Sequence, residues 1–187
     1  MLSVKDQLHE LREVAQRCEA IIPDIEKFLP SVIETLKNGG RILTCGNGGS
    51  AADSLHLAQE FVGRYRTNRQ AFSAISLVAD ATALTCIGND WDYETIFSRQ
   101  VEAHGRAGDF FVCFTTSGNS PNIVKAIDVA KKMNITTLAL LGKTGGKCKD
   151  KADFEVIVPS DSTARIQEIH GWILHVILEA VEAVYHV

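Results

Sequence analysis

His56 and Glu60 are the residues whose types and spacing first suggest chemistry in this sequence. They are four positions apart in a stretch with helical spacing, so both side chains project from one face of the expected helix. An imidazole and a carboxylate placed in this way could share a metal ion or transfer a proton. The pattern therefore indicates a reaction site on this helix.

A glycine-rich turn comes directly before that helix, within the segment RILTCGNGGSAADSLHLAQEFVGR at residues 41–64. The apolar run 42–45 predicts a strand, and the glycines after it can adopt positive φ and expose backbone N–H groups. Ser50 or Asp53 is expected to cap the following helix. Such a turn suits a phosphate, because N–H groups at a helix N-terminus bind anions. A tight strand-to-helix connection without a ligand is the alternative, since glycine-rich turns are common in α/β proteins.

A second polar turn follows the most continuous apolar strand of the chain, predicted at residues 110–114. Gly118 permits a turn there, and Ser120 followed by Pro121 is a strong start signal for a helix. The turn carries four hydroxyl side chains, from Thr115, Thr116, Ser117 and Ser120. Many donors at a helix N-terminus suit a phosphate monoester. Hydroxyl-rich capping with no ligand is the other interpretation.

Two further sets of polar residues are weaker candidates. Asn89 and Asp90 follow Gly88 at the end of an apolar helical stretch that begins at residue 81, which in most proteins is only a turn signal. Gln167 and His175 lie off the centre of the apolar stripe of a long closing helix, from residue 162 or 163 to about 185. On spacing alone His175 is more typical of a core residue than of a catalyst, and His170 is no less plausible.

The remaining elements alternate between strands and helices. Strands are expected at 42–45, 74–78, 110–114, 136–141 and 154–158, with helices between them that include 81–88 and 93–104. This alternation predicts an α/β fold with a five-stranded parallel sheet and helices on both faces. Ligands of such sheets bind beyond the carboxyl ends of the strands, where both polar turns lie.

Two amphipathic helices precede the first strand, at about 2–20 and from Pro23 to residue 38, where Asn38 and two glycines end the second one. They carry more apolar surface than one small sheet needs. Part of that surface is therefore expected to pack against another subunit.

Composition narrows the class of protein. A chain of 187 residues with mean hydropathy +0.03 can bury one core, so a single domain is expected. A net charge of −4 with scattered basic residues gives no support for a nucleic-acid partner. The five cysteines are odd in number and lack a CxxC pair, which indicates reduced thiols. No run approaches the ~20 apolar residues of a membrane span, and no signal peptide is evident, so we expect a cytoplasmic protein that contacts no membrane.

The motifs GNGGSAAD, GND at residue 88, TSGNSPN and ARIQEIH, together with His56 and Glu60, resemble the sugar isomerase (SIS) domain and within it the phosphoheptose isomerases. The resemblance covers the chain as a single SIS domain at 1–187 and implies a three-layer αβα sandwich. It also implies a homotetramer with active sites at subunit contacts, to which helices 2–38 and 163–185 contribute. The implied reaction converts sedoheptulose 7-phosphate to D-glycero-D-manno-heptose 7-phosphate, a precursor of bacterial surface polysaccharide.

The same resemblance assigns roles position by position. Glu60 and His175 match the catalytic pair. The positions that match zinc ligands, for one Zn²⁺ per subunit, are His56, Glu60, Gln167 and His175. Substrate contacts are implied for Asn47, Gly48, Gly49, Ser50, Asn89, Asp90 and Gln167, and phosphate contacts for Thr115, Thr116, Ser117 and Ser120. Gln167 and His175 are about 12 Å apart along one helix, so either long side chains converge or a neighbouring subunit supplies one ligand.

The chemistry implied by this resemblance needs a base, a second acid/base group and an electrophile, which Glu60, His175 and zinc could supply. A rival from another class is a non-catalytic regulator of the same fold that binds a replication initiator. It resembles this chain in the glycine turn and the RIQE segment but lacks the Glu60 and His175 pair. A sensor or an isomerase of another sugar phosphate is a third alternative, since the phosphate turn alone allows either.

Overall fold

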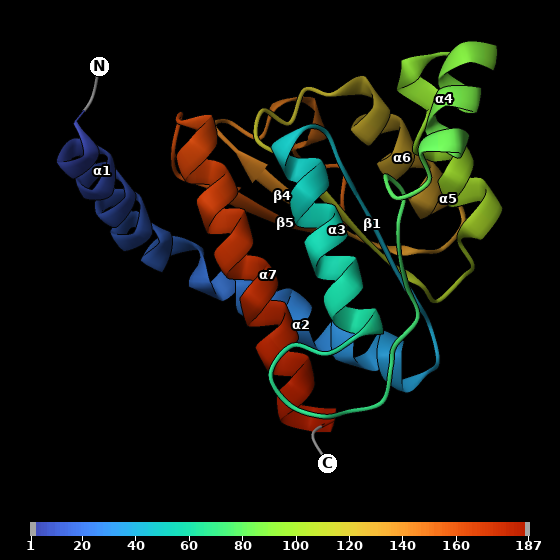
Figure 1. The fold of residues 1–187 in the computed structure, drawn as a ribbon, viewed down its shortest axis with the longest axis horizontal. Coiled ribbons are helices and arrows are strands. Elements are labelled where there is room, and N and C mark those ends of the chain that lie inside the picture. Colours follow the sequence, from blue (N-terminus) through green and yellow to red (C-terminus); the bar gives the residue numbers. More distant parts are fainter. Residues whose placement is uncertain (1–2, 186–187) are drawn as a thin grey trace.

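A computed structural model, which describes residues 3–185, contains one five-stranded parallel sheet between layers of helices (Figure 1). The strands are β1 (Ile42–Gly46), β2 (Ala74–Ser76), β3 (Phe110–Thr115), β4 (Thr136–Gly142) and β5 (Phe154–Val158). Their order across the sheet is β2-β1-β3-β4-β5, and every neighbouring pair is parallel. The predicted α/β fold is confirmed.

The strand order reverses beside β1. Ile42 pairs with Ala74 of β2 on one side and with Phe110 of β3 on the other. The connections after β1 and β3 consequently leave the same edge of the sheet in neighbouring positions. A reversal of this kind opens a crevice at the carboxyl ends of the strands, where ligands of α/β proteins bind.

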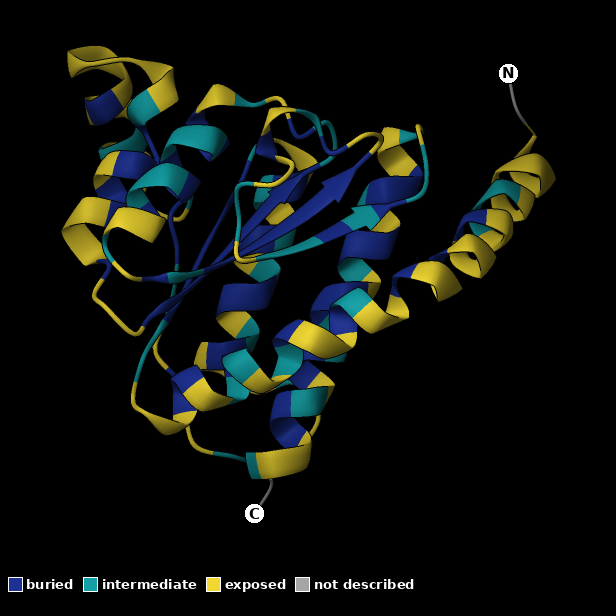
Figure 2. Ribbon diagram, turned by 180° about the vertical axis from the view of Figure 1, so that it is seen from behind, coloured by how far each residue is buried: buried dark blue, intermediate teal, exposed yellow. Residues whose placement is uncertain are grey.

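Helices cover both faces of the sheet. Their bounds are α1 (Val4–Arg17), α2 (Ile22–Lys37), α3 (Gly49–Val62), α4 (Ala81–Asp90), α5 (Ser98–His104), α6 (Pro121–Lys132) and α7 (Thr163–Tyr185), with short 3₁₀ turns at η1 (Cys18–Ile21), η2 (Tyr93–Thr95) and η3 (Gly146–Cys148). Alternate strand side chains face opposite layers, which divides the core in two. One half packs against α2, α3 and α7, and the other against α5 and α6. The strands between the helix layers are largely buried (Figure 2).

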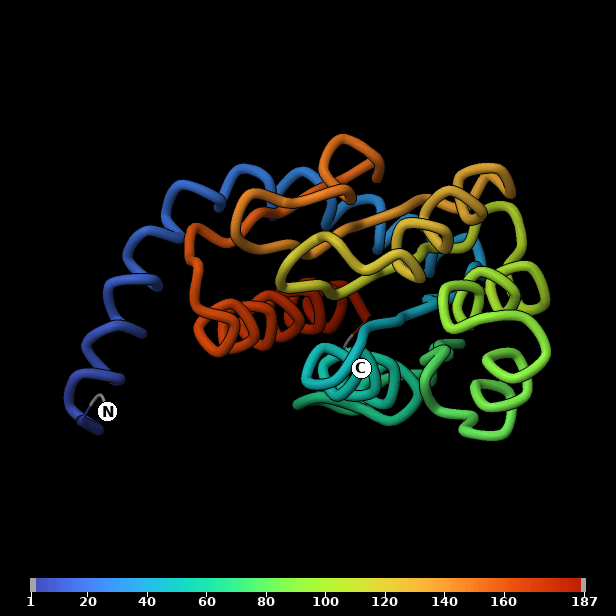
Figure 3. Tube along the Cα trace, turned by 90° about the horizontal axis from the view of Figure 1, so that it is seen from above, coloured from blue at the N-terminus to red at the C-terminus, as the bar shows by residue number. Residues whose placement is uncertain are grey.

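The α1 helix extends away from the body of the molecule (Figure 3). Its side chains Val4 and Leu8 are 84% and 58% exposed, whereas Val14, near its C-terminal end, is fully buried. Arg165 of α7 holds it by donating a hydrogen bond of 2.6 Å to the carbonyl oxygen of Gln7. Apolar side chains of the N-terminal helices are therefore exposed mainly on α1, and their packing against another subunit stays a prediction.

Several predicted boundaries were wrong for local reasons. The helix expected at 2–20 gives way to the 3₁₀ turn at Cys18, and residue 2 lies outside the described residues. The expected helix 93–104 is a 3₁₀ turn followed by α5, and β2 is three residues long instead of five. The α4 helix does not stop at Gly88 but continues through Asn89 and Asp90, because the Trp91 N–H still bonds to the carbonyl oxygen of Ile87.

The cysteines are free, as predicted: four are buried and Cys86 is exposed. Burial raises the pKa of the Cys45 and Cys113 thiols well above the usual value, so both stay protonated near neutral pH. No helix within residues 3–185 combines the length and apolar character needed to cross a bilayer.

His170 is a core residue. Its side chain is completely buried on α7, with Nε2 3.1 Å from the carbonyl oxygen of Leu141 and the ring edge against Phe114. Burial lowers the pKa of His170 to about 4, against the weaker opposing effect of the Leu141 carbonyl. The neutral imidazole is therefore part of the packing between α7 and the sheet.

Acidification should weaken the fold through His170. Its pKa is lower in the folded chain than in the unfolded chain, so its stabilising effect is complete above pH 6.5 and is lost as pH falls toward 4. Between pH 7.5 and pH 5, the free energy of unfolding in urea should fall by about 2 kcal/mol more in the wild type than in His170→Gln. His9→Gln, at an exposed histidine, is the control and should leave the pH dependence intact. An unchanged pH dependence in His170→Gln would contradict this assignment.

Candidate active site

The two polar turns meet at the carboxyl ends of β1 and β3. Asn47, in the turn after β1, exchanges two amide hydrogen bonds of 3.0 Å with Asn122 at the start of α6. The Tyr93 hydroxyl donates a third bond of 3.0 Å to Asn47 Oδ1. Asn122 and Tyr93 were not predicted as site residues. The available sequence clue for Asn122 was an asparagine directly after the Ser120 and Pro121 start signal, and the structure buries it. These contacts fix the first turn against the second.

The glycine turn begins α3 without a side-chain cap. Gly48 is the N-cap residue, with φ of 58°, and neither Ser50 nor Asp53 caps the helix, so that prediction was wrong. Ser50 is buried within the first turn of α3. Gly49 leaves room for Gln167 of α7, because a Cβ at Gly49 would lie 2.4 Å from the Gln167 amide nitrogen. The turn therefore brings the N-terminal ends of α3 and α7 close together.

The second turn is folded against the loop after β4. The Gly118 N–H donates to Thr115 Oγ1 over 3.2 Å, and the Cys148 N–H donates to the Gly118 carbonyl over 2.9 Å. Ser120 occupies the N-cap position of α6 as predicted, but its side chain makes no capping hydrogen bond. Thr115 is buried, and the half-buried hydroxyl residues at this edge are Thr116, Ser117 and Ser120.

The α3 and α7 helices run side by side in the same direction (Figure 1). His56 Nε2 lies 3.6 Å from Glu60 Oε1 on α3, and the His56 ring centre lies 5.2 Å from that of His175 on α7. The Tyr65 ring, just beyond α3, stacks on His175 at 5.4 Å. The structure therefore groups the side chains of His56, Glu60 and His175 and excludes His170, which faces the sheet.

Within a single subunit, Gln167 does not lie with His56, Glu60 and His175. Its side chain lies against Gly49, whereas His175 lies against His56, two helical turns further along α3. Within residues 3–185, no three His, Cys, Asp or Glu side chains form a ready-made metal site. The donor types nevertheless suit zinc, and two imidazoles on one tetrahedral zinc at about 2.1 Å have ring centres about 5 Å apart.

The electrostatics of the group favour a neutral imidazole. Burial lowers the pKa of His175, and His56 lowers it further, while Glu179 and Glu60 act in the opposite direction. A neutral imidazole can accept a proton or bind a metal. On the same face of α3, one oxygen of Asp53 is buried without a hydrogen-bond partner in the described structure, and burial raises the pKa of Asp53 to about 6.

An apolar cleft of about 610 Å³ opens on the other side of the glycine turn, toward α4. Gly48, Gly88 and Tyr93 are among the residues that line it. Asn89 and Asp90 follow Gly88 and are exposed; they bond to each other over 2.9 Å, and the Cys86 thiol bonds to Asp90. The structure thus places these two residues beside the cleft, separate from the His56, Glu60 and His175 group.

Comparison with known proteins places this geometry in a family. A model of the SIS domain matches residues 7–142. The chain is 47% identical to a phosphoheptose isomerase of Akkermansia muciniphila over 96% of this chain and 95% of that protein, and 45% identical to one of Helicobacter pylori over 95% and 93%. It superimposes on the phosphoheptose isomerase structure from Neisseria gonorrhoeae with a TM-score of 0.90 and 38% identity, covering 96% of this chain and 97% of that one. It superimposes on the phosphoheptose isomerase structure from Francisella tularensis with a TM-score of 0.88 and 30% identity, covering 97% of this chain and 100% of that one.

Gly118→Ala should disrupt the second turn. Gly118 has φ of 64°, and a Cβ there would lie 1.8 Å from the Gly145 carbonyl oxygen. We expect the free energy of unfolding in urea to fall by at least about 2 kcal/mol, since the backbone conformation alone costs an L-residue about 1–2 kcal/mol. Gly39→Ala is the control, because Gly39 has φ of 76° but no atom within 4 Å of the added Cβ. Equal losses in the two variants would contradict the packing described here.

Proposed function

The chain belongs to the SIS domain family and, within it, to the phosphoheptose isomerases, and from this membership we propose that it converts sedoheptulose 7-phosphate to D-glycero-D-manno-heptose 7-phosphate. The observation that carries the proposal is the grouping of Glu60 and His175 around His56, at 3.6 Å and 5.2 Å, on two helices that begin at the edge of the sheet where the polar turns lie. The product would enter the synthesis of heptose for bacterial surface polysaccharide.

The reaction interconverts a ketose and an aldose. A base removes a proton from C1 of the ketose, and the electron pair moves to the C2 oxygen to give an enediolate. A proton is then delivered to C2 while the C1 hydroxyl loses its proton to form the aldehyde. We assign the base to Glu60 and the second acid/base group to His175, whose lowered pKa keeps it neutral and able to take up a proton near pH 7.

The phosphate end of the sugar is assigned to the second turn. Four hydroxyl groups and the N-terminus of α6 offer donors to a dianion there, through Thr115, Thr116, Ser117 and Ser120. The sugar hydroxyls are assigned to the glycine turn and to the end of α4, with contacts from Asn47, Gly48, Gly49, Ser50, Asn89 and Asp90. Anchoring at one end holds a flexible sugar in a reactive orientation.

One Zn²⁺ per subunit is proposed at His56, Glu60, Gln167 and His175. A zinc ion held there would polarise the sugar carbonyl and stabilise the enediolate oxygens. The position of Gln167 against Gly49 supports supply of one ligand by a neighbouring subunit and also supports a direct contact between Gln167 and the substrate.

A homotetramer with active sites at subunit contacts is proposed from the exposed apolar side chains. They lie on the N-terminal helix and around the site, at Val4, Leu8, Leu55, Val62 and Trp172. Exposed apolar surface near a site favours burial by another chain. A cytoplasmic location is proposed because all five cysteines are free, as in a reducing compartment.

The direct experiment is incubation of the purified protein with sedoheptulose 7-phosphate. Formation of the aldose heptose 7-phosphate is expected. No turnover by protein that contains its full complement of metal would exclude this function and favour a regulator or sensor.

Glu60→Gln should abolish chemistry while leaving substrate binding intact. The change keeps the side-chain volume and removes the proton acceptor, so kcat should fall by at least about 100-fold, as for loss of a general base. His175→Gln should behave in the same way, and the double variant should lose little more than either single one if the two act as a unit.

Ser120→Ala provides the matched contrast, since it should raise KM more than it lowers kcat. The metal content of every variant must be measured, because Glu60 and His175 are also proposed ligands. A Glu60 or His175 variant that retains its metal and a near-normal kcat would remove that residue from the mechanism.

The assembly should be visible by light scattering. At micromolar concentration we expect a particle of about 82 kDa, four times the 20.4 kDa chain. A monomer with full activity would contradict the proposal that active sites form at subunit contacts.

A further inference from the structure

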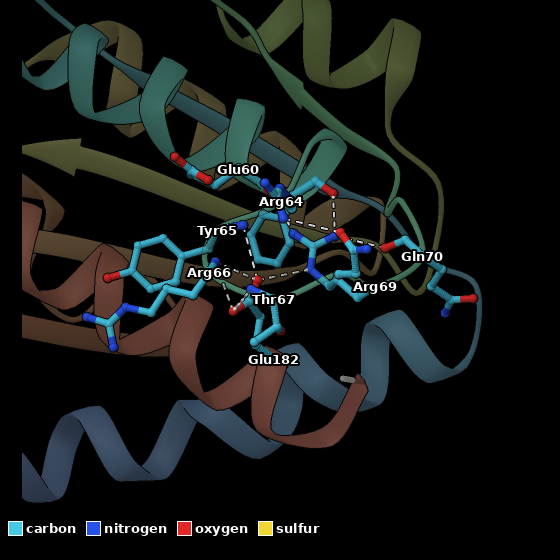
Figure 4. A network of polar contacts seen from close by, with 10 residues as sticks. Glu60, Arg64, Tyr65, Arg66, Thr67, Arg69, Gln70 and Glu182 are labelled. Carbon is cyan, nitrogen blue, oxygen red and sulfur yellow. Dashed lines mark hydrogen bonds and ion pairs between the residues drawn. The ribbon is translucent and has the colours of Figure 1, made fainter. Parts of the chain in front are cut away.

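We infer that Arg69 and Glu182 are positioning residues that hold the two helices of the catalytic pair in register. The inference rests on the proposed roles of Glu60 and His175. Arg69 lies in the segment between α3 and β2, and Glu182 lies in the last turns of α7 (Figure 4). Their side chains are only 1% and 8% exposed, and Arg69 Nε lies 3.8 Å from Glu182 Oε1.

Arg69 binds the end of α3 that carries Glu60. Its guanidinium donates hydrogen bonds to the carbonyl oxygens of Glu60 and Phe61, the latter at 3.0 Å, and to that of Gln70 at 2.8 Å. The last carbonyl groups of a helix have no partner within the helix. Arg69 supplies that partner at the backbone of the proposed base itself.

Glu182 binds the segment that follows α3. Its two carboxylate oxygens accept hydrogen bonds of 3.1 Å from the N–H groups of Tyr65, Arg66 and Thr67. Burial acts to raise the pKa of Glu182, but these N–H groups outweigh it and hold the pKa below its usual value. Glu182 is therefore an anion that fixes three successive peptide groups to α7.

This attachment determines where the Tyr65 ring lies. The ring stacks on His175 with centres 5.4 Å apart and an angle of 21° between the planes. Glu182 follows His175 by seven residues on α7, so both project from the same helix face. A continuous set of contacts thus runs from the Glu60 carbonyl through Arg69, Glu182 and Tyr65 to His175.

A buried ion pair as a whole contributes little net stability, because desolvation offsets the attraction between the charges, although removing one partner alone leaves the other charge buried and destabilises the fold. The effect of the pair on the reaction rate can be much larger than its effect on stability, since a displacement of about 1 Å at a reacting group can lower the rate about 100-fold. The loss of this pair should consequently appear in kcat, while the phosphate turns, which share none of these contacts, should preserve KM.

The chain contains a matched control three residues earlier on both segments. Arg66 and Glu179 also join the segment after α3 to α7, with Nη1 and Oε1 2.9 Å apart. Their side chains are 64% and 50% exposed. Surface pairs of this kind contribute little. The Arg66 guanidinium also lies 4.9 Å from the centre of the Tyr65 ring. Arg66→Gln therefore tests whether an exposed charge pair and its ring contact, with the Glu182 attachment intact, matter as much as the buried pair.

The test compares Arg69→Gln, Glu182→Gln and Arg66→Gln by steady-state kinetics with sedoheptulose 7-phosphate and by hydrogen exchange of residues 63–70. In the first two variants, kcat should fall at least about tenfold with KM within about threefold of the wild type. Exchange of the segment should accelerate at least about tenfold. Arg66→Gln should stay within about twofold in both measurements. If Arg69→Gln does not fold, Arg69→Lys replaces it in the test. Arg69→Lys keeps the positive charge but not the planar guanidinium, so it should fold with a kcat below that of the wild type but a smaller loss than that expected for Arg69→Gln.

Near-normal kcat in Arg69→Gln and Glu182→Gln, or in Arg69→Lys where the Gln variant does not fold, would overturn the inference. An equal loss in Arg66→Gln, or a fall in kcat without faster exchange of residues 63–70, would also overturn it. Hydrogen exchange is measured without substrate, so it tests the Arg69 and Glu182 attachment separately from the proposed isomerase function. A wild type without turnover refutes the proposed function, and unchanged exchange in the variants then refutes the Arg69 and Glu182 attachment independently.

Discussion

The parallel packing of α3 against α7 is the constraint on which the rest of the site depends. Both helices start at the carboxyl edge of the sheet, and Gly49 allows their first turns to approach so closely that Gln167 fills the space a Cβ would need. Because the helices run in the same direction, His56 and Glu60 on one meet His175 on the other further along. The sheet brings these two helices together, although residues 49 and 175 are far apart in the chain.

The reversal of strand order supplies the second half of the site. It places the turns after β1 and β3 next to each other, and the paired amides of Asn47 and Asn122 join them. Donors for an anion therefore lie at the carboxyl edge of the sheet, while His56, Glu60 and His175 lie two to three helical turns further along α3 and α7. A molecule with a phosphate at one end and a carbonyl at the other needs both.

Much of this could be predicted from the sequence, because the deciding features are local. The apolar runs predicted all five strands, and the start signal of Ser120 and Pro121 predicted the beginning of α6. The helical spacing of His56 and Glu60 placed them on one face. What failed were the ends of helices: Gly88 did not end α4, whose hydrogen bonds continue to Trp91, and Ser50 and Asp53 did not cap α3. The choice between His170 and His175 could not be made from spacing, since only the fold buries one against Leu141 and turns the other toward His56. That choice came from the family resemblance.

The central claim is that Glu60 and His175 move a proton between two neighbouring carbons of a sugar phosphate. The most direct measurement follows the conversion of sedoheptulose 7-phosphate in D₂O by NMR. The account predicts an aldose heptose 7-phosphate that carries solvent deuterium at C2, because a proton held by a side chain exchanges with the medium before its return. No aldose product at all, or an aldose product formed equally fast by Glu60→Gln, would contradict it.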